Sequence, residues 1–146
     1  MVRRKRHERV MIDTHIFIHY ANNPAELSEY VREVLDDPNT EVYMSAESIR
    51  EMVVAYNSRN LSSRRWTCAM DIVRDIVELY GIRILPISPE VVCRYAGLTL
   101  NDAQRHYDPS DHIIICHAIE EHLPLISNDG KFAFYTGQGL ELITDV

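Results

Sequence analysis

Short apolar runs alternate with longer segments of helical spacing through most of this 146-residue chain. Such alternation is typical of βαβ units, in which helices connect parallel strands. Strands are expected at residues 9–13, 41–45, 82–87 and 123–127, with a candidate fifth at 140–144. Helices are expected at residues 25–37, 46–56, 64–81, 88–97 and 108–122. The pattern predicts an α/β fold of three layers, with a central parallel sheet of four or five strands between helices.

Two of the predicted helices carry residues that favour helix ends. Gly81 ends the helix at 64–81 as a C-cap residue, and Ser88 begins the helix at 88–97 as an N-cap. The helix at 108–122 is apolar on almost every side, which predicts a central position in the fold.

The composition is that of one soluble globular domain, with 46% hydrophobic and 25% charged residues. The three cysteines, Cys68, Cys93 and Cys116, are odd in number and lack a CxxC spacing. Secreted domains of this size more often carry an even set of paired cysteines, so the sequence predicts a reducing, cytoplasmic location. Asp13 and His15 interrupt the apolar run near the start, and no stretch reaches the length of a membrane span.

The formal net charge of −7 argues against a broad electrostatic attraction to nucleic acid. Basic residues nevertheless gather in two places along the chain. The first group consists of Arg3, Arg4, Lys5, Arg6 and Arg9. The second group consists of Arg59, Arg64 and Arg65. Each group either contacts nucleic-acid phosphates or forms a solvated surface, and the sequence leaves both alternatives open.

Four acidic residues fall near the carboxyl ends of predicted strands, where ligands bind in open parallel sheets. Asp13 ends the first strand, and Glu51 lies in the second turn of the helix that follows the second strand. Asp111 lies in the first turn of the helix at 108–122, and Asp129 follows the fourth strand. These four carboxylates are therefore expected to approach one edge of the sheet from different segments.

Each of these acids, taken singly, also has an ordinary structural explanation. Asp13 can mark the point where a strand meets solvent, and Glu51 can be a surface residue. Asp108 and Asp111 suit the start of a helix, as an N-cap and a first-turn acid. Asp129 with the glycine after it is a common turn pair. None of these explanations accounts for four acids at one edge of a sheet.

Clustered carboxylates raise one another's pKa values unless a cation neutralises them. The chain has only two lysines, Lys5 and Lys131, for that purpose. A divalent cation would resolve the conflict, and oxygen ligands of this kind suit Mg²⁺ or Mn²⁺. The sequence therefore predicts metal-assisted hydrolysis of a phosphodiester, with one cation activating water and a second, if present, stabilising the leaving oxygen.

Three motifs resemble the PIN-domain nucleases, and more closely the VapC-type toxins of bacterial toxin–antitoxin systems. The opening strand of that family resembles MIDTHIF, with its acid at Asp13. A Ser-x-x-Ser/Thr-x-x-Glu motif resembles MSAESIREM, with Ser45, Ser48 and Glu51 at the matching positions. A long signature, from an Asp-Pro-x-Asp helix start to a Ser/Thr-x-Asp ending, resembles HYDPSDHIIICHAIEEHLPLISND.

This resemblance implies a PIN-like α/β/α fold and a Mg²⁺- or Mn²⁺-dependent endoribonuclease. It implies that the catalytic and metal-binding residues are Asp13, Glu51, Asp111 and Asp129. It also implies supporting residues around these ligands, namely Thr14, Ser45, Asp108 and Ser127, with Asp108 a helix cap first. Members of the family usually form homodimers and are silenced by an antitoxin whose tail covers the acidic site. RNA, an antitoxin and a second copy of the chain are therefore the expected partners.

The resemblance also implies a PIN domain at residues 10–146, after a basic N-terminal extension at 1–9. Such an extension is longer and more basic than the family usually has. It either contacts RNA or reflects the choice of start, because Met11 lies just ahead of the first acid. His112 stands where the family often has arginine.

Two other functions stay open: a stand-alone PIN nuclease in RNA processing, and a non-catalytic PIN-like module that binds RNA or a protein. Other α/β classes lack their motifs, because Asp13 has neither the adjacent acid of a receiver domain nor the Asp-x-Asp of a dehalogenase-like phosphatase. Gly137 and Gly139 precede a strand, which is the wrong context for dinucleotide binding. His117 and His122 lack the HExxH spacing of a zinc site and are predicted to form a structural pair on a helix face.

Overall fold

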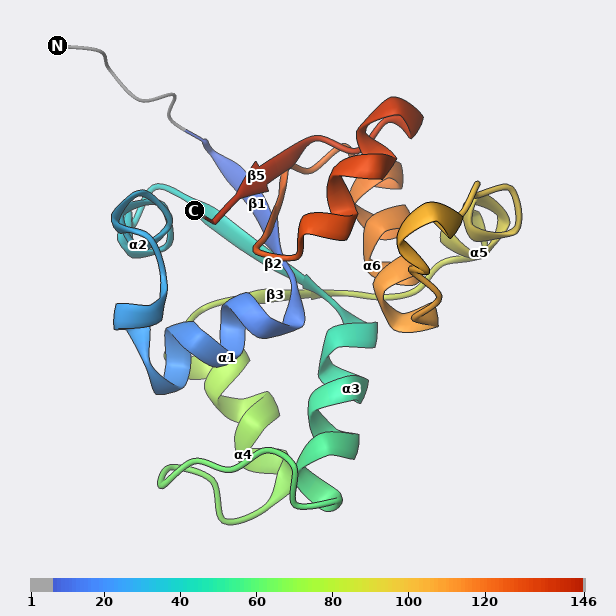
Figure 1. Ribbon diagram of the computed structural model, residues 1–146. Helices are drawn as coiled ribbons and strands as arrows, with labels where there is room; N and C mark the ends of the chain where they lie inside the picture. The colour runs from blue at the N-terminus through green and yellow to red at the C-terminus, as the bar shows by residue number, and fades with distance from the viewer. Residues whose placement is uncertain (1–6, 146) are drawn as a thin grey trace, which may run out of the picture.

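Five parallel strands form a single sheet in the computed structural model, which describes residues 7–145 (Figure 1). The strands are β1 (Arg9–Ile12), β2 (Glu41–Ser45), β3 (Arg83–Leu85), β4 (Leu125–Ser127) and β5 (Leu142–Thr144). Their order across the sheet is β3-β2-β1-β4-β5, which places β1 at the centre. Met11 in β1 lies beside Tyr43 of β2 and beside Leu125 of β4. The candidate fifth strand is therefore confirmed, and every neighbouring pair is parallel as predicted.

Helices connect the strands and cover both faces of the sheet. The α-helices are α1 (Thr14–Asn22), α2 (Glu29–Asp36), α3 (Ala46–Asn57), α4 (Ala69–Arg74), α5 (Pro89–Ala96) and α6 (Pro109–Glu120). A π-helical turn, η2 (Asp75–Leu79), continues α4. Within residues 7–145, three 3-10 helices complete the set: η1 (Pro24–Glu26), η3 (Asp102–Gln104) and η4 (Gly130–Gln138). Figure 1 shows α1, α3 and α4 below the sheet, and α6 with the red η4 on its other side.

Successive residues of the central strands face opposite sides of the sheet, as three layers require. In β1, Val10 and Ile12 pack into one core with α1 to α4, whereas Met11 packs into a second core with α6 and η4. In β4, Leu125 belongs to the second core and Ile126 to the first. All five side chains are completely buried. The predicted three-layer α/β/α fold is confirmed.

The helix α6 has the predicted start and the predicted central position. Asp108 is its N-cap, and the carboxylate of Asp108 accepts a hydrogen bond from the backbone N–H of Ser110 at 2.9 Å. Residues 114–119 are buried against the sheet and the neighbouring helices. The prediction that His117 and His122 form a pair on one face of this helix is wrong, however. His117 is buried within α6, whereas His122 lies beyond its end, exposed and with a left-handed φ of 54°.

The structure contains one α-helix that the sequence pattern did not predict, α1, directly after β1. Asp13 is its N-cap and accepts a hydrogen bond from the backbone N–H of Ile16 at 2.9 Å. Isoleucine, phenylalanine and tyrosine make up much of α1, and these residues are common in strands. The helix was therefore not predicted from the composition of the segment. Asp13 was interpreted as the end of a strand and as a candidate ligand, not as an N-cap.

Two predicted helices begin later than their patterns suggested. Ser28 caps α2, so the segment before it forms the short turn η1 instead. Thr67 donates hydrogen bonds from its backbone N–H and its hydroxyl to the carboxylate of Asp71, which closes a loop ahead of α4. Gly81 follows the last helical turn with a φ of +63°, as expected of a C-cap glycine.

Of the two groups of basic residues, the first lies largely outside the described residues and the second lies in an exposed loop. The positions 3–6 lie outside the described residues, and Arg9 is exposed at the start of β1. Arg59, Arg64 and Arg65 are exposed in the loop after α3, where Arg65 forms an ion pair with Asp75 at 3.0 Å. The division of the chain at residue 10 stays a prediction. Between residues 7 and 145, no helix is long and apolar enough to cross a membrane.

Candidate active site

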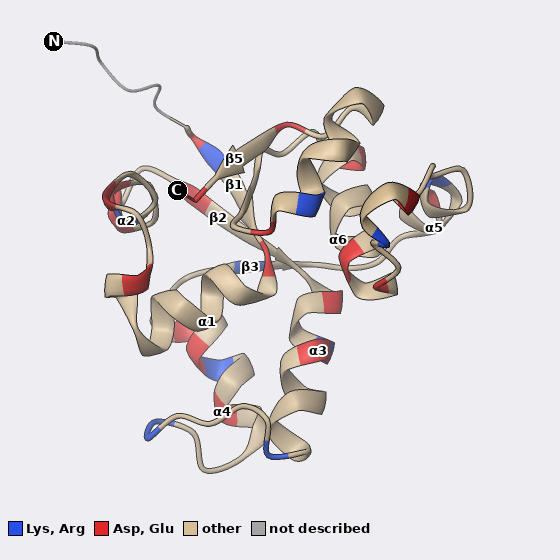
Figure 2. Ribbon diagram, viewed as in Figure 1, with Lys and Arg blue, Asp and Glu red and all other residues tan. Residues whose placement is uncertain are grey.

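The four predicted acids line one cavity of about 540 Å³ at the carboxyl edge of the sheet. Asp13 follows β1 and Asp129 follows β4, so two neighbouring strands deliver the first pair. Glu51 comes from α3 and Asp111 from α6. Acidic segments in Figure 2 face this region from α3, from the start of α6 and from the loop ahead of η4. The predicted convergence of these segments on one edge is therefore seen in the structure.

Asp13 is the most enclosed of the four acids, with 5% of its surface exposed. Its two carboxylate oxygens accept hydrogen bonds from the backbone N–H of Ile16, at 2.9 Å, and from the hydroxyl of Ser127, at 2.6 Å. Burial raises the pKa of Asp13 to about 6, against the lowering effect of these hydrogen bonds, and the charge of Asp111 adds to the rise. The folded protein therefore holds this carboxylate at a cost in free energy.

Ser127 links two of the acids through one hydroxyl group. It donates to Asp13 and accepts a hydrogen bond from the backbone N–H of Asp129 at 3.1 Å. The carboxylate of Asp129 in turn accepts from the backbone N–H of Lys131 at 2.9 Å, which makes Asp129 the N-cap of η4. The turn after β4 thus fixes the position of both acids relative to the sheet.

Glu51 is held by the hydroxyl of Thr14, which donates a hydrogen bond of 2.7 Å to its carboxylate. Burial raises the pKa of Glu51, and the charges of Asp108 and Asp111 raise it further. Because Thr14 is the first residue of α1, this bond ties the start of one helix to the second turn of α3. Thr14 and Ser127 therefore contact the carboxylates that they were expected to orient.

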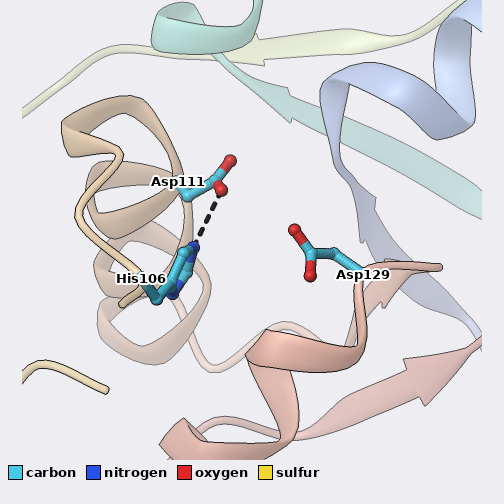
Figure 3. Close-up of side chains that lie close together, drawn as sticks. All are labelled: His106, Asp111 and Asp129. Atoms are coloured by element: carbon cyan, nitrogen blue, oxygen red, sulfur yellow. Dashed lines mark hydrogen bonds and ion pairs between the residues drawn. The ribbon is translucent and has the colours of Figure 1, made fainter. Parts of the chain in front are cut away.

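Asp111 projects from the first turn of α6 toward Asp129, as Figure 3 shows. The imidazole of His106 forms a hydrogen bond of 2.8 Å with one of its oxygens. Burial raises the pKa of Asp111, and the charges of Asp108 and Asp129 add to the rise. One ligand atom each from His106, Asp111 and Asp129 can be chosen so that all three lie within 4.8 Å of one another.

Glu51, Asp111 and Asp129 each have one carboxylate oxygen that accepts a hydrogen bond (held) and one that accepts none from residues 7–145 (open). The held oxygens accept bonds from Thr14, His106 and the N–H of Lys131. Over residues 7–145, the second oxygen of each of these acids accepts no hydrogen bond from the protein. Anchored carboxylates with open oxygens are the donor set that Mg²⁺ or Mn²⁺ prefers, so these residues fit a divalent cation.

A neighbouring acid shows the contrast between a paired carboxylate and these four. Glu47 of α3 forms an ion pair with Arg50 and accepts a hydrogen bond of 2.7 Å from the hydroxyl of Ser110. The hydrogen bond from Arg50 lowers the pKa of Glu47, although the residue is largely buried. Among the described residues, none of the four cavity acids has an ion pair with lysine or arginine. Arg50 compensates the charge of Glu47, whereas no lysine or arginine pairs with the four cavity acids among the described residues.

The remaining predicted supporting residues have different positions. Asp108 lines the cavity besides capping α6. Ser45 does not meet the expectation that it supports the ligands: it is fully buried, and its hydroxyl accepts from the N–H of Glu47 at 3.1 Å and hydrogen-bonds His117 Nδ1 at 2.9 Å. The physical reason is its place as N-cap of α3, which directs the hydroxyl into the helix rather than into the cavity.

Three further ionisable residues line the cavity but could not be recognised as site residues from the sequence: His106, Arg105 and Lys131. His106 precedes Asp111 by five positions in a loop, where helical or strand periodicity gives no information about contact. Lys131 is one of only two lysines in the sequence, and its proximity to the acids follows from its place two residues after Asp129. Arg105 has a left-handed φ of 52°, which no sequence signal indicated.

Comparison with known proteins gives one family match and several matches of fold. The model of the PIN domain family matches residues 10–136. VapBC2 from Rickettsia felis, solved bound to a DNA fragment from its promoter, is 20% identical with a TM-score of 0.68, covering 93% of this chain and 98% of that chain. VapBC-1 from nontypeable Haemophilus influenzae is 22% identical with a TM-score of 0.65, covering 93% and 97%.

A third solved structure, VapBC-5 from Mycobacterium tuberculosis, is described as a member of a family of toxin–antitoxin systems. It is 21% identical with a TM-score of 0.64, and the match covers 94% of this chain and 98% of that chain. A search of curated proteins found no match. Identities near 20% establish a common fold, whereas the family match extends over most of the chain and over all four cavity acids.

Proposed function

The chain belongs to the PIN domain family, and from that membership we propose that it is a metal-dependent endoribonuclease, the toxin of a toxin–antitoxin pair. The observation that carries the proposal is the convergence of Asp13, Glu51, Asp111 and Asp129 on one cavity, where none of them forms an ion pair with lysine or arginine among the described residues. Metal-assisted hydrolysis of a phosphodiester at such a site uses water as the nucleophile and does not need a histidine or cysteine in that role.

We assign the four acids as ligands of Mg²⁺ or Mn²⁺. When bound, such a cation lowers the pKa of water and neutralises the charge that develops on the scissile phosphate. The contribution of the protein is to hold the carboxylates in place: Thr14 orients Glu51, and Ser127 orients both Asp13 and Asp129. Arrangements of this kind reduce the reorganisation that a reaction requires.

The same cavity offers groups suited to an RNA backbone. Arg105 and Lys131 line it beside the acids, and both side chains bind phosphate through charged N–H donors. With a net charge of −7, the chain as a whole repels nucleic acid, so RNA must be recognised through local basic groups of this kind. Asp13 and Asp111 would then face the phosphate that these two cations position.

The partner proposal comes from the structural neighbours, one of which is described as a member of the VapBC family of toxin–antitoxin systems. We propose that an antitoxin likewise binds this chain and covers the acidic cavity. A basic side chain of that partner would neutralise the carboxylates in place of a metal ion. A homodimer stays a prediction, as does the role of the N-terminal basic segment.

The proposal is tested with purified protein freed of any antitoxin. RNA cleavage should require Mg²⁺ or Mn²⁺, stop in EDTA, and be lost in Asp111→Asn while the circular dichroism spectrum is retained. Glu121→Gln is the matched control, because it removes the same charge from an exposed position at the other end of α6 and should leave cleavage unchanged. Cleavage that persists in EDTA would refute the metal-dependent mechanism, and RNA binding without turnover at saturating Mn²⁺ would favour a binding module.

A further inference from the structure

His106 is buried between a proposed metal ligand and a tyrosine, although the proposed metal-dependent chemistry assigns it no role. Only 2% of its surface is exposed. Its Nε2 atom lies 2.8 Å from Oδ2 of Asp111, and its Nδ1 atom lies 2.9 Å from the hydroxyl of Tyr135. Both ring nitrogens are therefore engaged, one by the candidate site and one by the protein interior.

The partners of the ring determine where its proton lies. Asp111 is a carboxylate when it binds a cation, and an ionised carboxylate only accepts hydrogen bonds. Nε2 of His106 must therefore carry the proton that is donated to Asp111. In the neutral ring, Nδ1 is then an acceptor, and the hydroxyl of Tyr135 is the donor that faces it.

A backbone group supports this direction of hydrogen bonding. The N–H of Asn101 donates to the oxygen of Tyr135 at 3.2 Å, so a lone pair of that oxygen is already occupied. The hydroxyl proton of Tyr135 is then free to point at His106. The result is one chain of donors, from Asn101 to Tyr135 to His106 to Asp111, in which each link fixes the next.

The packing around the ring prevents it from turning away from Asp111. The ring centroid of Phe132 lies 5.5 Å from the ring centroid of His106, and that of His112 lies 5.0 Å from it. Nε2 of His112 also hydrogen-bonds the backbone carbonyl of His106 at 2.8 Å, which anchors the main chain. Ring and backbone of His106 are both held in place.

We propose that His106 is a positioning residue that fixes Asp111 through its Nε2–H, with Tyr135 setting the tautomer, and that it is not itself a metal ligand. This inference rests on the proposed function of the acidic cavity. His106 has a nitrogen close enough to Asp111 and Asp129 to share an ion with them. A nitrogen that carries a proton has no lone pair for a metal, however. The hydrogen bond engages one oxygen of Asp111, and the other oxygen accepts no hydrogen bond from residues 7–145 (Figure 3).

The tautomer is tested first on the metal-free protein. Nitrogen-15 NMR of the histidine side chains should give His106 as the Nε2–H form. Tyr135→Phe removes the donor to Nδ1 and should reduce the population of that form. A ring that carries its proton on Nδ1 alone would overturn the inference, and this measurement needs neither metal nor activity.

Metal affinity provides the second test, with Mn²⁺ titrated into the full chain. His106→Gln places an amide N–H near the position of Nε2 and should retain affinity within a few-fold. His106→Asn places its amide near Nδ1, loses the bond to Asp111, and should bind Mn²⁺ about 10- to 100-fold more weakly, as expected for loss of a group that orients a ligand. His122→Asn is the matched control, because His122 is exposed and its φ of 54° suits asparagine.

The outcomes separate this inference from the proposed function. Wild-type protein that binds no Mn²⁺ would refute the metal site itself, whatever the tautomer. Wild-type protein that binds Mn²⁺ while His106→Asn binds equally well would refute the positioning role. Spin-echo spectroscopy of bound Mn²⁺ should lack coupling to a directly bonded nitrogen, and such coupling, lost in His106→Gln, would make His106 a ligand instead.

Discussion

Burial and hydrogen bonding act in opposite directions on the pKa of the Asp13 carboxyl group. Its folded-state pKa of about 6 lies above the ordinary value of 3.8, mainly because burial penalises the charged form. A group whose pKa is raised by folding binds its proton more tightly in the folded state. The metal-free protein therefore loses stability as the pH rises from about 4 through 6.

Asp13→Asn is expected to stabilise the metal-free protein at pH 8 by about 1 to 3 kcal/mol, because it removes a buried charge and keeps a good N-cap for α1. The same variant should lose RNA cleavage. Urea unfolding in EDTA measures the gain, which should largely disappear at pH 3, below the ordinary pKa of 3.8, where the wild-type carboxyl group is mostly protonated in both the folded and the unfolded state. A variant less stable than wild type at pH 8 would show that hydrogen bonding at Asp13 outweighs desolvation.

Protonation of Asp13 should also control cation binding, since a metal must displace the proton. We expect Mn²⁺ affinity to fall as the pH drops through about 6. Ser127→Ala removes a hydrogen bond that lowers the pKa of Asp13, so the midpoint of this fall should move to higher pH. Calorimetric titration across pH 5 to 8 provides the measurement. Ser58→Ala, which removes an exposed hydroxyl bonded to a backbone carbonyl, should leave the midpoint unchanged.

At the level of helices and strands, the glycine that follows the last residue of the η2 turn illustrates what this residue type contributes. Gly81 has a φ of +63°, a region that is costly for residues with a Cβ atom, although nothing lies within 4 Å of the added atom. Gly81→Ala should therefore destabilise the fold by about 1 kcal/mol through backbone strain alone. Gly97→Ala at the end of α5, where φ is −98°, should be neutral or stabilise by about 0.5 kcal/mol. Thermal or urea unfolding of both variants gives the comparison, and equal effects would contradict the backbone explanation.

The strands could be predicted from the sequence because each is a short, largely apolar run between segments of helical spacing. In contrast, α1 was not predicted, because its apolar residues are types that are common in strands, and its start depends on the contact between Asp13 and Ile16 N–H. The later start of α4 depends on a side-chain bond between Thr67 and Asp71. Both misses occur where a local hydrogen bond, rather than periodicity, decides where a helix begins.

At the scale of the whole molecule, the order of the strands in the sheet explains which parts of the site were predictable. Asp13 and Asp129 follow strands that lie side by side, so the rule for parallel sheets places them at one edge. His106 reaches Asp111 only because the loop from 97 to 108 folds back over Tyr135 and Phe132. Loop geometry of this kind depends on contacts between distant segments, and a single sequence carries no signal for it.

The convergence of four acids on one cavity also makes a prediction for the stability of the entire fold. A cation that binds the folded state and not the unfolded state stabilises by about 2.7 kcal/mol at a concentration of 100 times its dissociation constant. Mg²⁺ or Mn²⁺ should therefore raise the thermal midpoint of the wild-type protein, and should do so much less in Asp111→Asn, which loses an open carboxylate oxygen.

The control for that experiment follows from the net charge of −7, since any salt reduces general repulsion on an acidic protein. NaCl at matched ionic strength reproduces this screening but supplies no ligand for the cavity. If NaCl raised the midpoint of the wild type as far as MnCl₂ does, the four acids would be acting as a diffuse negative surface. A rise confined to divalent cations and dependent on Asp111 requires instead that a divalent cation binds in the cavity lined by these carboxylates, which come from the end of β1, from α3, from α6 and from the turn after β4.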